Sequence, residues 1–516
     1  MRLIEIGVRW NGRRLTVWRC RSCIVGLCFL GVSRLMTHYD LIVIGSGPGG
    51  RRAAIQAAKF KKKVLVVERG YRVGGVCVHT GTIPSKTLRE TVLNLSGWRE
   101  RGFYGRGYRV KHDISADDLK RRLSITLDHE VEILEHQLTR NAVTRASGTA
   151  SFIDPHRVSV TNSEGKVQEY SADRFILAVG TVPFRPNDVP FDGETVVDPD
   201  EILDLKRLPR SLAVIGAGVI GLEYATIFSA LDVKVTVIDP ASCLLPFVDQ
   251  ELVDEFVHDL RDRGMTMRLK SKMTRVEIVA PQSCLVHLED GRQVQAEMVL
   301  YAAGRQGATD ALNLDAVGLS GDLRGRLTAD KKTFQTAVPH IYAVGDIIGF
   351  PSLASTSMEQ GRIAACHAFN EEAPAAPEFF PYGIYCVPEI STIGMTEEQA
   401  RERKIPFECG VARFRETSRG HIMGLSSGFM KLVFAIETRR LLGAHIVGEG
   451  ATELIHIGQA VLNLGGTLDY FVENTFNYPT LAEAYKIAAL DAWNRMPRAQ
   501  TSVSVFADMR SRAASA

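Results

Sequence analysis

Two glycine-rich turns with identical spacing are the residues of this chain best suited to holding a phosphorylated ligand. The first turn contains Gly45, Gly47 and Gly50 and follows an apolar run at residues 40–44. In such a turn Gly45 permits the tight bend, Gly47 lets the backbone approach a pyrophosphate, and Gly50 lets the following helix pack on the strand. The N-terminus of that helix then faces the phosphates, so the pattern predicts a dinucleotide site.

An acidic residue completes each of the two patterns. A second apolar run, residues 64–67, ends at Glu68, where a carboxylate can accept hydrogen bonds from a ribose diol. About 170 residues later the pattern recurs, with a second set of glycines and an acid: Gly216, Gly218, Gly221 and Asp239. Two complete patterns predict two dinucleotide sites, as in a flavoprotein that exchanges electrons with a nicotinamide cofactor. A duplicated Rossmann domain with one inactive site is the alternative.

The elements around these turns predict an α/β fold. Residues 114–145 have the composition of a long polar helix, and residues 150–154 and 157–160 resemble a β-hairpin. Three further apolar strands each end in a glycine: Gly180, Gly304 and Gly345. Small residues at strand ends let a chain crossing or a cofactor come close. Asp346, after the last of them, can accept a bond from a ribityl hydroxyl or cap the next helix.

Composition excludes several classes of protein. The chain has 516 residues, of which 45% are hydrophobic and 23% charged, as in ordinary globular proteins of several domains. Lys and Arg number 62 against 59 Asp and Glu, too even a balance to indicate nucleic acid or a membrane as a partner. Nine scattered cysteines do not resemble a disulfide framework, which favours a reducing, cytoplasmic location. The thirteen histidines show no metal-ligand spacing, so no metal site is expected.

Residues 1–36 differ from the rest, with seven arginines and a single acid. The apolar run at residues 24–32 is shorter than the ~20 residues that span a bilayer, and no signal-peptide cleavage site follows it. Cys20 and Cys23 lack a second Cys/His pair for zinc. We interpret this segment as a basic extension without regular structure, or as upstream sequence before a true start at Met36.

The loop after the first dinucleotide pattern carries a resemblance to a known family. It contains Gly74, Gly75, Val76, Cys77, Thr82 and Lys86. With both glycine patterns and Asp346, it resembles the pyridine nucleotide–disulfide oxidoreductases, which include lipoamide dehydrogenase and glutathione reductase. The likeness runs from about Thr37 to Arg495. In the disulfide-reducing members, two cysteines with four residues between them form a redox disulfide beside the flavin, whereas here Thr82 stands at the second position.

A second motif of these relatives is also altered. Their His-Pro-Thr-x-x-Glu motif, contributed across a dimer interface, reads here Tyr478-Pro479-Thr480 with Glu483. Tyrosine, with an ordinary pKa of about 10, is a poor acid–base group for thiol chemistry at pH 7. The resemblance therefore implies FAD-dependent hydride transfer from NADPH to NAD, with no redox-active disulfide.

The resemblance also implies roles for particular residues. Lys86 and Glu223 match an ion pair near flavin N5, although Glu223 is alternatively an ordinary helix acid, and Cys77 is alternatively a buried apolar filler. The implied FAD ligands are Gly45, Gly47, Gly50, Glu68, Arg69, Gly74, Gly75, Val76, Cys77, Lys86, Gly180 and Asp346. The implied NAD(P) ligands are Gly216, Gly218, Gly221, Asp239 and Gly304.

The predicted organisation is two Rossmann-like domains and a C-terminal α+β dimerisation domain that makes a homodimer or larger homo-oligomer. The FAD-binding domain comprises residues 37–190 and 311–378, interrupted by the NAD(P)-binding domain at residues 191–310. A linker rich in Pro and Ala precedes the dimerisation domain at residues 379–496. Residues 497–516 are expected to be a flexible tail.

Asp239 leaves the choice of nucleotide open. An acid at this position binds an adenine ribose diol and repels a 2′-phosphate, which favours NADH. The next Lys or Arg along the chain after Lys234 is Arg261. An NAD(P)H diaphorase or quinone reductase on the same scaffold is therefore an alternative, as is a flavin-holding interaction protein without turnover. A lipoamide dehydrogenase is disfavoured by Thr82 and Tyr478.

Overall fold

The computed structural model describes residues 4–10, 13–19, 37–373 and 378–497, and the chain divides into two units at His38. In the first unit β1 (Ile4–Trp10) pairs antiparallel with β2 (Arg13–Arg19). The expectation of no regular structure is therefore wrong for these residues, whose sequence alternates apolar and polar types as strands do. Cys20, Cys23 and Met36 lie outside the described residues, so the expectations about them stay untested.

The second unit begins with a seven-stranded sheet in the order β5-β4-β3-β8-β7-β6, with β19 beside β8. Strands β3, β4 and β5 are parallel. Residues 41–44 of β3 and 64–67 of β4 are apolar and buried, as expected when helices cover both faces, whereas β5 is polar and mostly exposed. The strands are β3 (Thr37–Ile44), β4 (Val64–Glu68), β5 (Thr144–Ser147), β6 (Thr149–Asp154), β7 (Arg157–Thr161), β8 (Val167–Leu177) and β19 (Ile341–Ala343).

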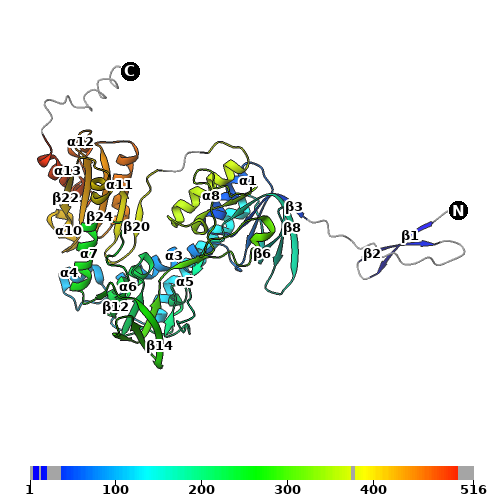
Figure 1. The fold of residues 1–516 in the computed structure, drawn as a ribbon, viewed down its shortest axis with the longest axis horizontal. Coiled ribbons are helices and arrows are strands. Elements are labelled where there is room, and N and C mark those ends of the chain that lie inside the picture. The colour runs from blue at the N-terminus through cyan, green and yellow to red at the C-terminus, as the bar shows by residue number, and fades with distance from the viewer. Residues whose placement is uncertain (1–3, 11–12, 20–36, 374–377, 498–516) are drawn as a thin grey trace, which may run out of the picture. The chain divides into compact units, whose positions relative to one another are not determined.

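Helices far apart in sequence cover this sheet. Helix α8 lies beside α1 (Figure 1), so close that a Cβ on Gly361 would stand 2.0 Å from the Gly49 carbonyl oxygen. The predicted polar helix begins at a Ser115 capping box but ends at Arg140, and β5 follows. The helices are α1 (Pro48–Lys59), α2 (Gly75–His79), α3 (Thr82–Leu95), α4 (Arg101–Tyr104), α5 (Ala116–Arg140) and α8 (Ala354–Ala368).

The second glycine pattern belongs to a five-stranded parallel sheet in the order β10-β17-β11-β12-β13. Its strands and helices are β10 (Val196–Val197), β11 (Ser211–Ile215), α6 (Val219–Ala230), β12 (Lys234–Ile238), α7 (Gln250–Asp262), β13 (Thr266–Arg268) and β17 (Met298–Tyr301). An antiparallel meander, which the sequence analysis did not predict, connects β13 to β17: β14 (Met273–Ala280), β15 (Ser283–Leu288) and β16 (Gln293–Ala296). Strands β9 (Thr181–Pro183) and β18 (Arg305–Gly307) pair antiparallel with each other in a separate two-stranded sheet.

The C-terminal part is an antiparallel sheet in the order β20-β21-β24-β23-β22 with helices packed on it, so the predicted α+β class is confirmed (Figure 1). Its strands are β20 (Tyr382–Ile384), β21 (Ile390–Gly394), β22 (Phe407–Arg413), β23 (Phe429–Ala435) and β24 (Leu441–Val447). Its helices are α9 (Glu397–Glu402), α10 (Ser418–Met423), α11 (Ala451–Asn463), α12 (Leu468–Glu473) and α13 (Glu483–Arg495). The domain boundaries remain predictions.

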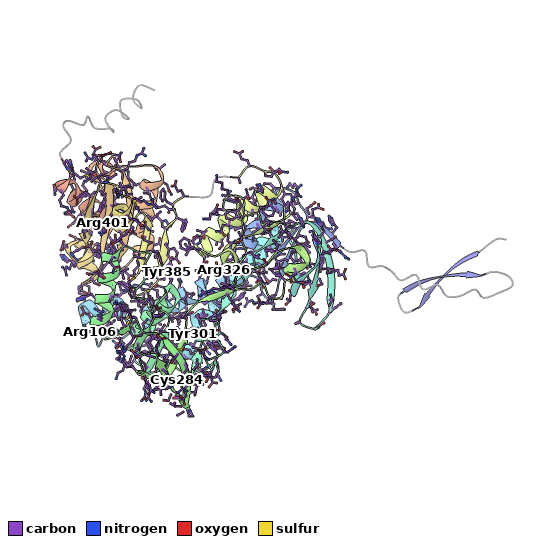
Figure 2. The ribbon with its side chains drawn as sticks, viewed as in Figure 1. Arg106, Cys284, Tyr301, Arg326, Tyr385 and Arg401 are labelled. Carbon is purple, nitrogen blue, oxygen red and sulfur yellow. The ribbon has the colours of Figure 1, made fainter. Side chains whose placement is uncertain are left out.

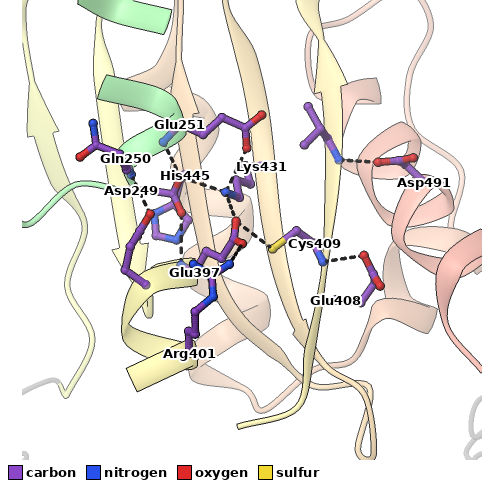
Figure 3. Close-up of polar contacts among 12 residues, drawn as sticks. Asp249, Gln250, Glu251, Glu397, Arg401, Glu408, Cys409, Lys431, His445 and Asp491 are labelled. Carbon is purple, nitrogen blue, oxygen red and sulfur yellow. Dashed lines mark hydrogen bonds and ion pairs between the residues drawn. The ribbon is translucent and has the colours of Figure 1, made fainter. Parts of the chain in front are cut away.

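A buried lysine joins this sheet to the start of α7. Figure 3 shows Lys431 of β23 among three carboxylates. Its ammonium nitrogen lies 3.1 Å from an oxygen of Asp249, 3.0 Å from one of Glu251 and 2.5 Å from one of Glu397. The Lys431 side chain is 1% exposed. The hydrogen bond with Glu397 and the charge of Asp249 outweigh the effect of burial and raise the pKa of Lys431. Because a buried charge is costly without partners, this cluster fixes α7 against β23.

Candidate active site

The first glycine turn, between β3 and α1, has the geometry that its three glycines predict. Gly45 has φ +102°, and a Cβ there would stand 2.3 Å from the Ala178 carbonyl oxygen. A Cβ on Gly50 would stand 2.0 Å from the Gly45 carbonyl oxygen. A Cβ on Gly47 would meet nothing within 4 Å. Gly45 and Gly50 are therefore required by backbone packing, whereas Gly47 leaves its backbone accessible at the N-terminus of α1.

A cleft opens beside this turn. Nine of the predicted FAD-site residues line it: Gly45, Gly47, Glu68, Arg69, Gly75, Val76, Cys77, Gly180 and Asp346. Gly50, Gly74 and Lys86 are not among its lining residues. Sequence reasoning missed other lining residues, among them Thr149, Thr181, Leu312 and Ser357, because their sequences carry no motif and only the fold brings them here.

The Glu68 carboxylate connects three parts of the cleft wall. One oxygen accepts hydrogen bonds from the Ser46 backbone N–H at 2.9 Å and the Ser46 hydroxyl at 2.6 Å. The other oxygen accepts from the Gly70 N–H at 2.9 Å. The Ser46 hydroxyl oxygen in turn accepts a hydrogen bond from the Gly74 N–H at 2.9 Å. Gly74 therefore helps to hold Ser46 in place without lining the cleft itself. The open backbone at Gly47, the helix N-terminus and this acid together fit the pyrophosphate and ribose of a dinucleotide such as FAD.

The second glycine turn, between β11 and α6, repeats this geometry. Gly216 has φ +103°, and a Cβ there would stand 2.7 Å from the Ala302 carbonyl oxygen. A Cβ on Gly221 would stand 2.0 Å from the Gly216 carbonyl oxygen, and one on Gly218 would meet nothing within 4 Å. Gly304, at the end of β17, has φ +124°. The backbone around Gly218 is thus as open to a pyrophosphate as that around Gly47.

Asp239 lies at the end of β12 with both carboxylate oxygens engaged. One accepts a hydrogen bond from the Ala217 N–H at 2.6 Å, and the other accepts from the Ala241 N–H at 2.7 Å. The first contact places the carboxylate beside the glycine turn, as the pattern predicts. Carboxylate oxygens can accept more than one bond, so a ribose diol can still be bound there.

Lys86 and Glu223, 137 residues apart in sequence, form an ion pair. The Lys86 ammonium donates to the two Glu223 carboxylate oxygens at 2.8 and 2.6 Å. The Glu223 side chain is 6% exposed and that of Lys86 is 26% exposed. A carboxylate this deeply buried requires a partner, so Glu223 is not an ordinary surface acid of its helix. The placement of the pair near flavin N5 remains a proposal.

Tyr385, which follows β20 (Figure 2), is a residue of this site that sequence reasoning missed. Its backbone N–H donates to Glu223 at 2.9 Å, and the Lys86 ammonium lies 4.8 Å from the centre of its ring. Its neighbours bind the same two helices, because the Cys386 carbonyl accepts from Arg89 at 3.0 Å and the Val387 N–H donates to the Thr226 hydroxyl at 3.1 Å. No local motif signals this role, since it arises from the docking of a distant segment.

Cys77 and Thr82 lie together where the relatives carry two cysteines. Both line the cleft. Burial raises the pKa of the Cys77 thiol, an effect that a hydrogen bond with Thr82 partly offsets. The cysteines of the described residues are free thiols: Cys77, Cys243, Cys284, Cys366, Cys386 and Cys409.

Asp346 is an acid of the cleft wall. Burial raises its pKa, while Arg305 and Thr181 oppose that rise.

The altered C-terminal motif contains Tyr478 and Glu483. Tyr478 is 69% exposed, and its hydroxyl forms a hydrogen bond with the Ser418 hydroxyl. One carboxylate oxygen of Glu483 is buried without a hydrogen-bond partner. Tyr478 thus occupies the histidine position of the motif, and Glu483 keeps its acid.

Within residues 4–19 as described, 37–373 and 378–497, no three His, Cys, Asp or Glu side chains are grouped to hold a metal ion. None of the helices in that part of the chain is both long and apolar enough to cross a membrane.

Comparison with known proteins agrees with this geometry. Residues 39–361 match the family described as "Pyridine nucleotide-disulphide oxidoreductase", and residues 380–489 match its dimerisation domain. The chain is 51% identical over 462 residues to a protein of Mycobacterium bovis named "Soluble pyridine nucleotide transhydrogenase", covering 89% of this chain and 98% of the relative. A protein of the same name from Colwellia psychrerythraea is 43% identical with the same coverage.

A solved structure shares the fold as well. The crystal structure of LpdA from Mycobacterium tuberculosis superposes with a TM-score of 0.80 at 26% identity, covering 88% of this chain and 99% of that one. The family match extends over more than half of the chain, and the arrangement of two Rossmann-like folds before a dimerisation domain confirms the predicted fold class. This chain belongs to the pyridine nucleotide–disulphide oxidoreductase family.

Proposed function

We propose that this chain transfers hydride from NADPH to NAD through bound FAD, the reaction of a Si-specific NAD(P)⁺ transhydrogenase. The observation that carries the proposal is Thr82 beside the free thiol of Cys77 in the cleft, because a hydroxyl cannot form the disulfide of the related reductases. Relatives at 51% and 43% identity named soluble pyridine nucleotide transhydrogenase support it. FAD, when bound, supplies a ring that accepts a hydride and gives it up to a second nucleotide.

The residues of the two glycine turns hold and orient the nucleotides. Gly47 and the N-terminus of α1 present backbone N–H groups to the FAD pyrophosphate, and Glu68 binds its ribose. Gly218 and α6 do the same for NADPH and NAD in turn, with Asp239 at the ribose. Hydride transfer needs proximity and orientation more than an acid or a base, so most of the protein's contribution is positional.

Lys86 and Glu223 act electrostatically. Their pairing keeps the region close to neutral while placing a cation on α3, where it can offset negative charge that develops on a bound flavin. Cys77 takes no part as a nucleophile, because burial raises its pKa and the thiolate is the reactive form.

An NADH-dependent diaphorase or quinone reductase is the second candidate, and Asp239 is the observation that favours it. A carboxylate at the ribose repels a 2′-phosphate, and at an effective dielectric of ~20 two unit charges 4 Å apart interact by ~4 kcal/mol. Exposure to water weakens that repulsion. The two candidates differ in their donor and in their acceptor.

We further propose that the chain works as a homodimer or larger homo-oligomer through residues 380–489, which match the dimerisation domain, and that it does so in the cytoplasm. A cytoplasmic location suits its free cysteines and its use of pyridine nucleotides. Light scattering with size-exclusion chromatography measures the assembly, and a monomer at micromolar concentration would contradict the first part.

Stopped-flow spectroscopy of the FAD-loaded protein tests the proposed reaction. NADPH should bleach the flavin absorbance within milliseconds to seconds, and NAD added next should restore it. In steady state, NADPH with thio-NAD should turn over faster than NADH with a quinone. The opposite order would establish the diaphorase, and a flavin that neither NADPH nor NADH bleaches would indicate a protein that only holds its flavin. Measurable dihydrolipoamide oxidation would contradict the roles given to Thr82 and Tyr478.

A further inference from the structure

An arginine, Arg268, lies next to the end of β12 in the structure although it is far from Asp239 in the sequence. The next Lys or Arg along the chain after Lys234 is Arg261, which is in α7 rather than in the loop after Asp239. In the structure, however, β13 pairs parallel with β12, and Ile238 stands opposite Arg268. The Asp239 N–H donates to the Arg268 carbonyl oxygen at 3.0 Å. The backbone of Arg268 is therefore bonded directly to that of the acid that marks the ribose.

The Arg268 guanidinium makes no ion pair within the described part of the chain. Its Nε atom is buried and has no hydrogen-bond partner, and among residues 37–373 and 378–497 its side chain makes no ion pair. Asp290 is the acid whose pKa Arg268 lowers, but the larger effect on it comes from Arg292, whose Nε donates to Asp290 at 2.7 Å. An arginine with a buried, unpaired N–H is costly unless a ligand satisfies it.

The segment after β13 is hydrogen-bonded to the backbone at Asp239 and Ala241. The Ser271 N–H donates to the Asp239 carbonyl at 3.0 Å, and the Lys270 N–H donates to the Ala241 carbonyl at 2.9 Å. Lys270 is exposed and has φ +52°. Lys272, by contrast, already pairs with Glu289 at 3.2 Å. Two cations, Arg268 and Lys270, thus flank the loop that begins at Asp239, and neither forms an ion pair among the described residues.

We propose that Arg268, assisted by Lys270, recognises the 2′-phosphate of NADPH and so offsets the repulsion by Asp239. This inference deepens the proposed function, on which it rests, by naming the residue that admits the phosphorylated donor. A guanidinium suits a phosphate because its N–H groups can bind two oxygens at once and its charge is permanent. Asp239 retains its role toward the unphosphorylated ribose of NAD, so one site accepts both nucleotides.

Binding of two mononucleotides to the FAD-loaded protein tests this without turnover. Isothermal titration measures the affinity for 2′,5′-ADP, which carries the 2′-phosphate, and for 5′-AMP, which lacks it. In Arg268→Met the affinity for 2′,5′-ADP should fall about tenfold to a hundredfold, the range of a charge-assisted hydrogen bond, while that for 5′-AMP changes less than twofold. In Lys270→Met the affinity for 2′,5′-ADP should fall less, by about threefold.

Arg275→Met is the matched control, because Arg275 is an arginine of the neighbouring β14 that pairs with Glu277 at 3.2 Å. It should bind both mononucleotides as wild type does. Unchanged 2′,5′-ADP binding in Arg268→Met overturns the inference, as does an equal loss of 5′-AMP binding, which would mark Arg268 as merely structural. If wild type binds 2′,5′-ADP tightly but NADPH does not bleach the flavin, the proposed function fails while the inference stands.

Discussion

The two glycine turns share their backbone geometry but differ in what ties them to the rest of the fold. At the first turn, Glu68 binds both the backbone and the hydroxyl of Ser46, and that hydroxyl also receives the Gly74 N–H. At the second turn Ala217 stands where Ser46 does and offers its backbone N–H alone to Asp239. The Ser46 hydroxyl thus connects the segment at Gly74 to the glycine turn and to Glu68.

The helix after each turn contacts segments that are distant in the sequence. The first turn packs against α8, from more than 300 residues later, and the Gly345 N–H beside the cleft donates to Gln360 of that helix at 2.8 Å. Helix α6 after the second turn likewise binds Tyr385 and Val387. Among the described residues, the Asp239 carboxylate bonds only to the N–H groups of Ala217 and Ala241. The two sites therefore differ at the acid, which Ser46 connects to a further segment in the first site but which bonds to backbone N–H groups in the second. The more connected acid suits a resident cofactor, and the less connected acid suits a nucleotide that must leave after each transfer.

The largest expected effect comes from a matched pair of glycine substitutions. A side chain at Gly50 or Gly221 would place its Cβ 2.0 Å from a backbone oxygen, a clash that the chain cannot relieve by moving a side chain. Gly50→Val should purify without FAD. Gly221→Val should retain FAD, measured by absorbance, and lose flavin bleaching by NADPH more than a hundredfold.

Gly107→Val is the control for this pair, because a Cβ at Gly107 meets nothing within 4 Å and the residue is exposed. Its FAD content and bleaching rate should equal those of wild type. If Gly50→Val keeps its flavin and Gly221→Val loses it, the assignment of the two sites is reversed.

The next largest effect is expected from Lys86→Met, which leaves Glu223 buried without its cation. The rate of flavin bleaching by NADPH should fall about tenfold or more, since a preorganised charge near reacting atoms is worth several kcal/mol. Lys120→Met, which removes a lysine from a surface pair with Asp204, is the control and should remain within twofold. Equal rates in the two variants would show that the Lys86–Glu223 pair is structural.

Asp239→Asn should raise the preference for NADPH over NADH by roughly fivefold to tenfold. The substitution removes a negative charge at the ribose, and ~1 kcal/mol of relieved repulsion in a solvated site corresponds to about fivefold. The ratio of kcat/KM with the two donors measures it. An unchanged ratio would mean that Asp239 does not face the ribose.

Tyr385→Leu should have the smallest effect among these variants. Loss of the ring removes a cation–π contact worth about 0.5–1 kcal/mol, so flavin bleaching should slow about two- to fivefold. Tyr385→Phe keeps the ring and is the matched control, expected to match wild type. Slowing by both variants to the same extent would assign the effect to the hydroxyl instead.

Both glycine turns and their acids were predictable from sequence, because a strand, a turn, a helix and an acid follow one another within some thirty residues. Tyr385 and Arg268 were not. Tyr385 reaches Glu223 only through the docking of a segment 162 residues away, and Arg268 meets Asp239 only because β13 pairs with β12. Sequence distance hides contacts of this kind, which makes Arg261 look like the nearest cation when Arg268 is adjacent in space.

The number of electrons that each FAD-loaded subunit takes up tests the central claim most directly. If Cys77 has no redox partner, anaerobic dithionite titration should bleach the flavin with two electrons per FAD, in wild type and in Cys77→Ser alike. A related reductase with a disulfide takes up two more. Uptake of four electrons by wild type, falling to two in Cys77→Ser, would show that Cys77 belongs to a redox-active disulfide and would contradict the account.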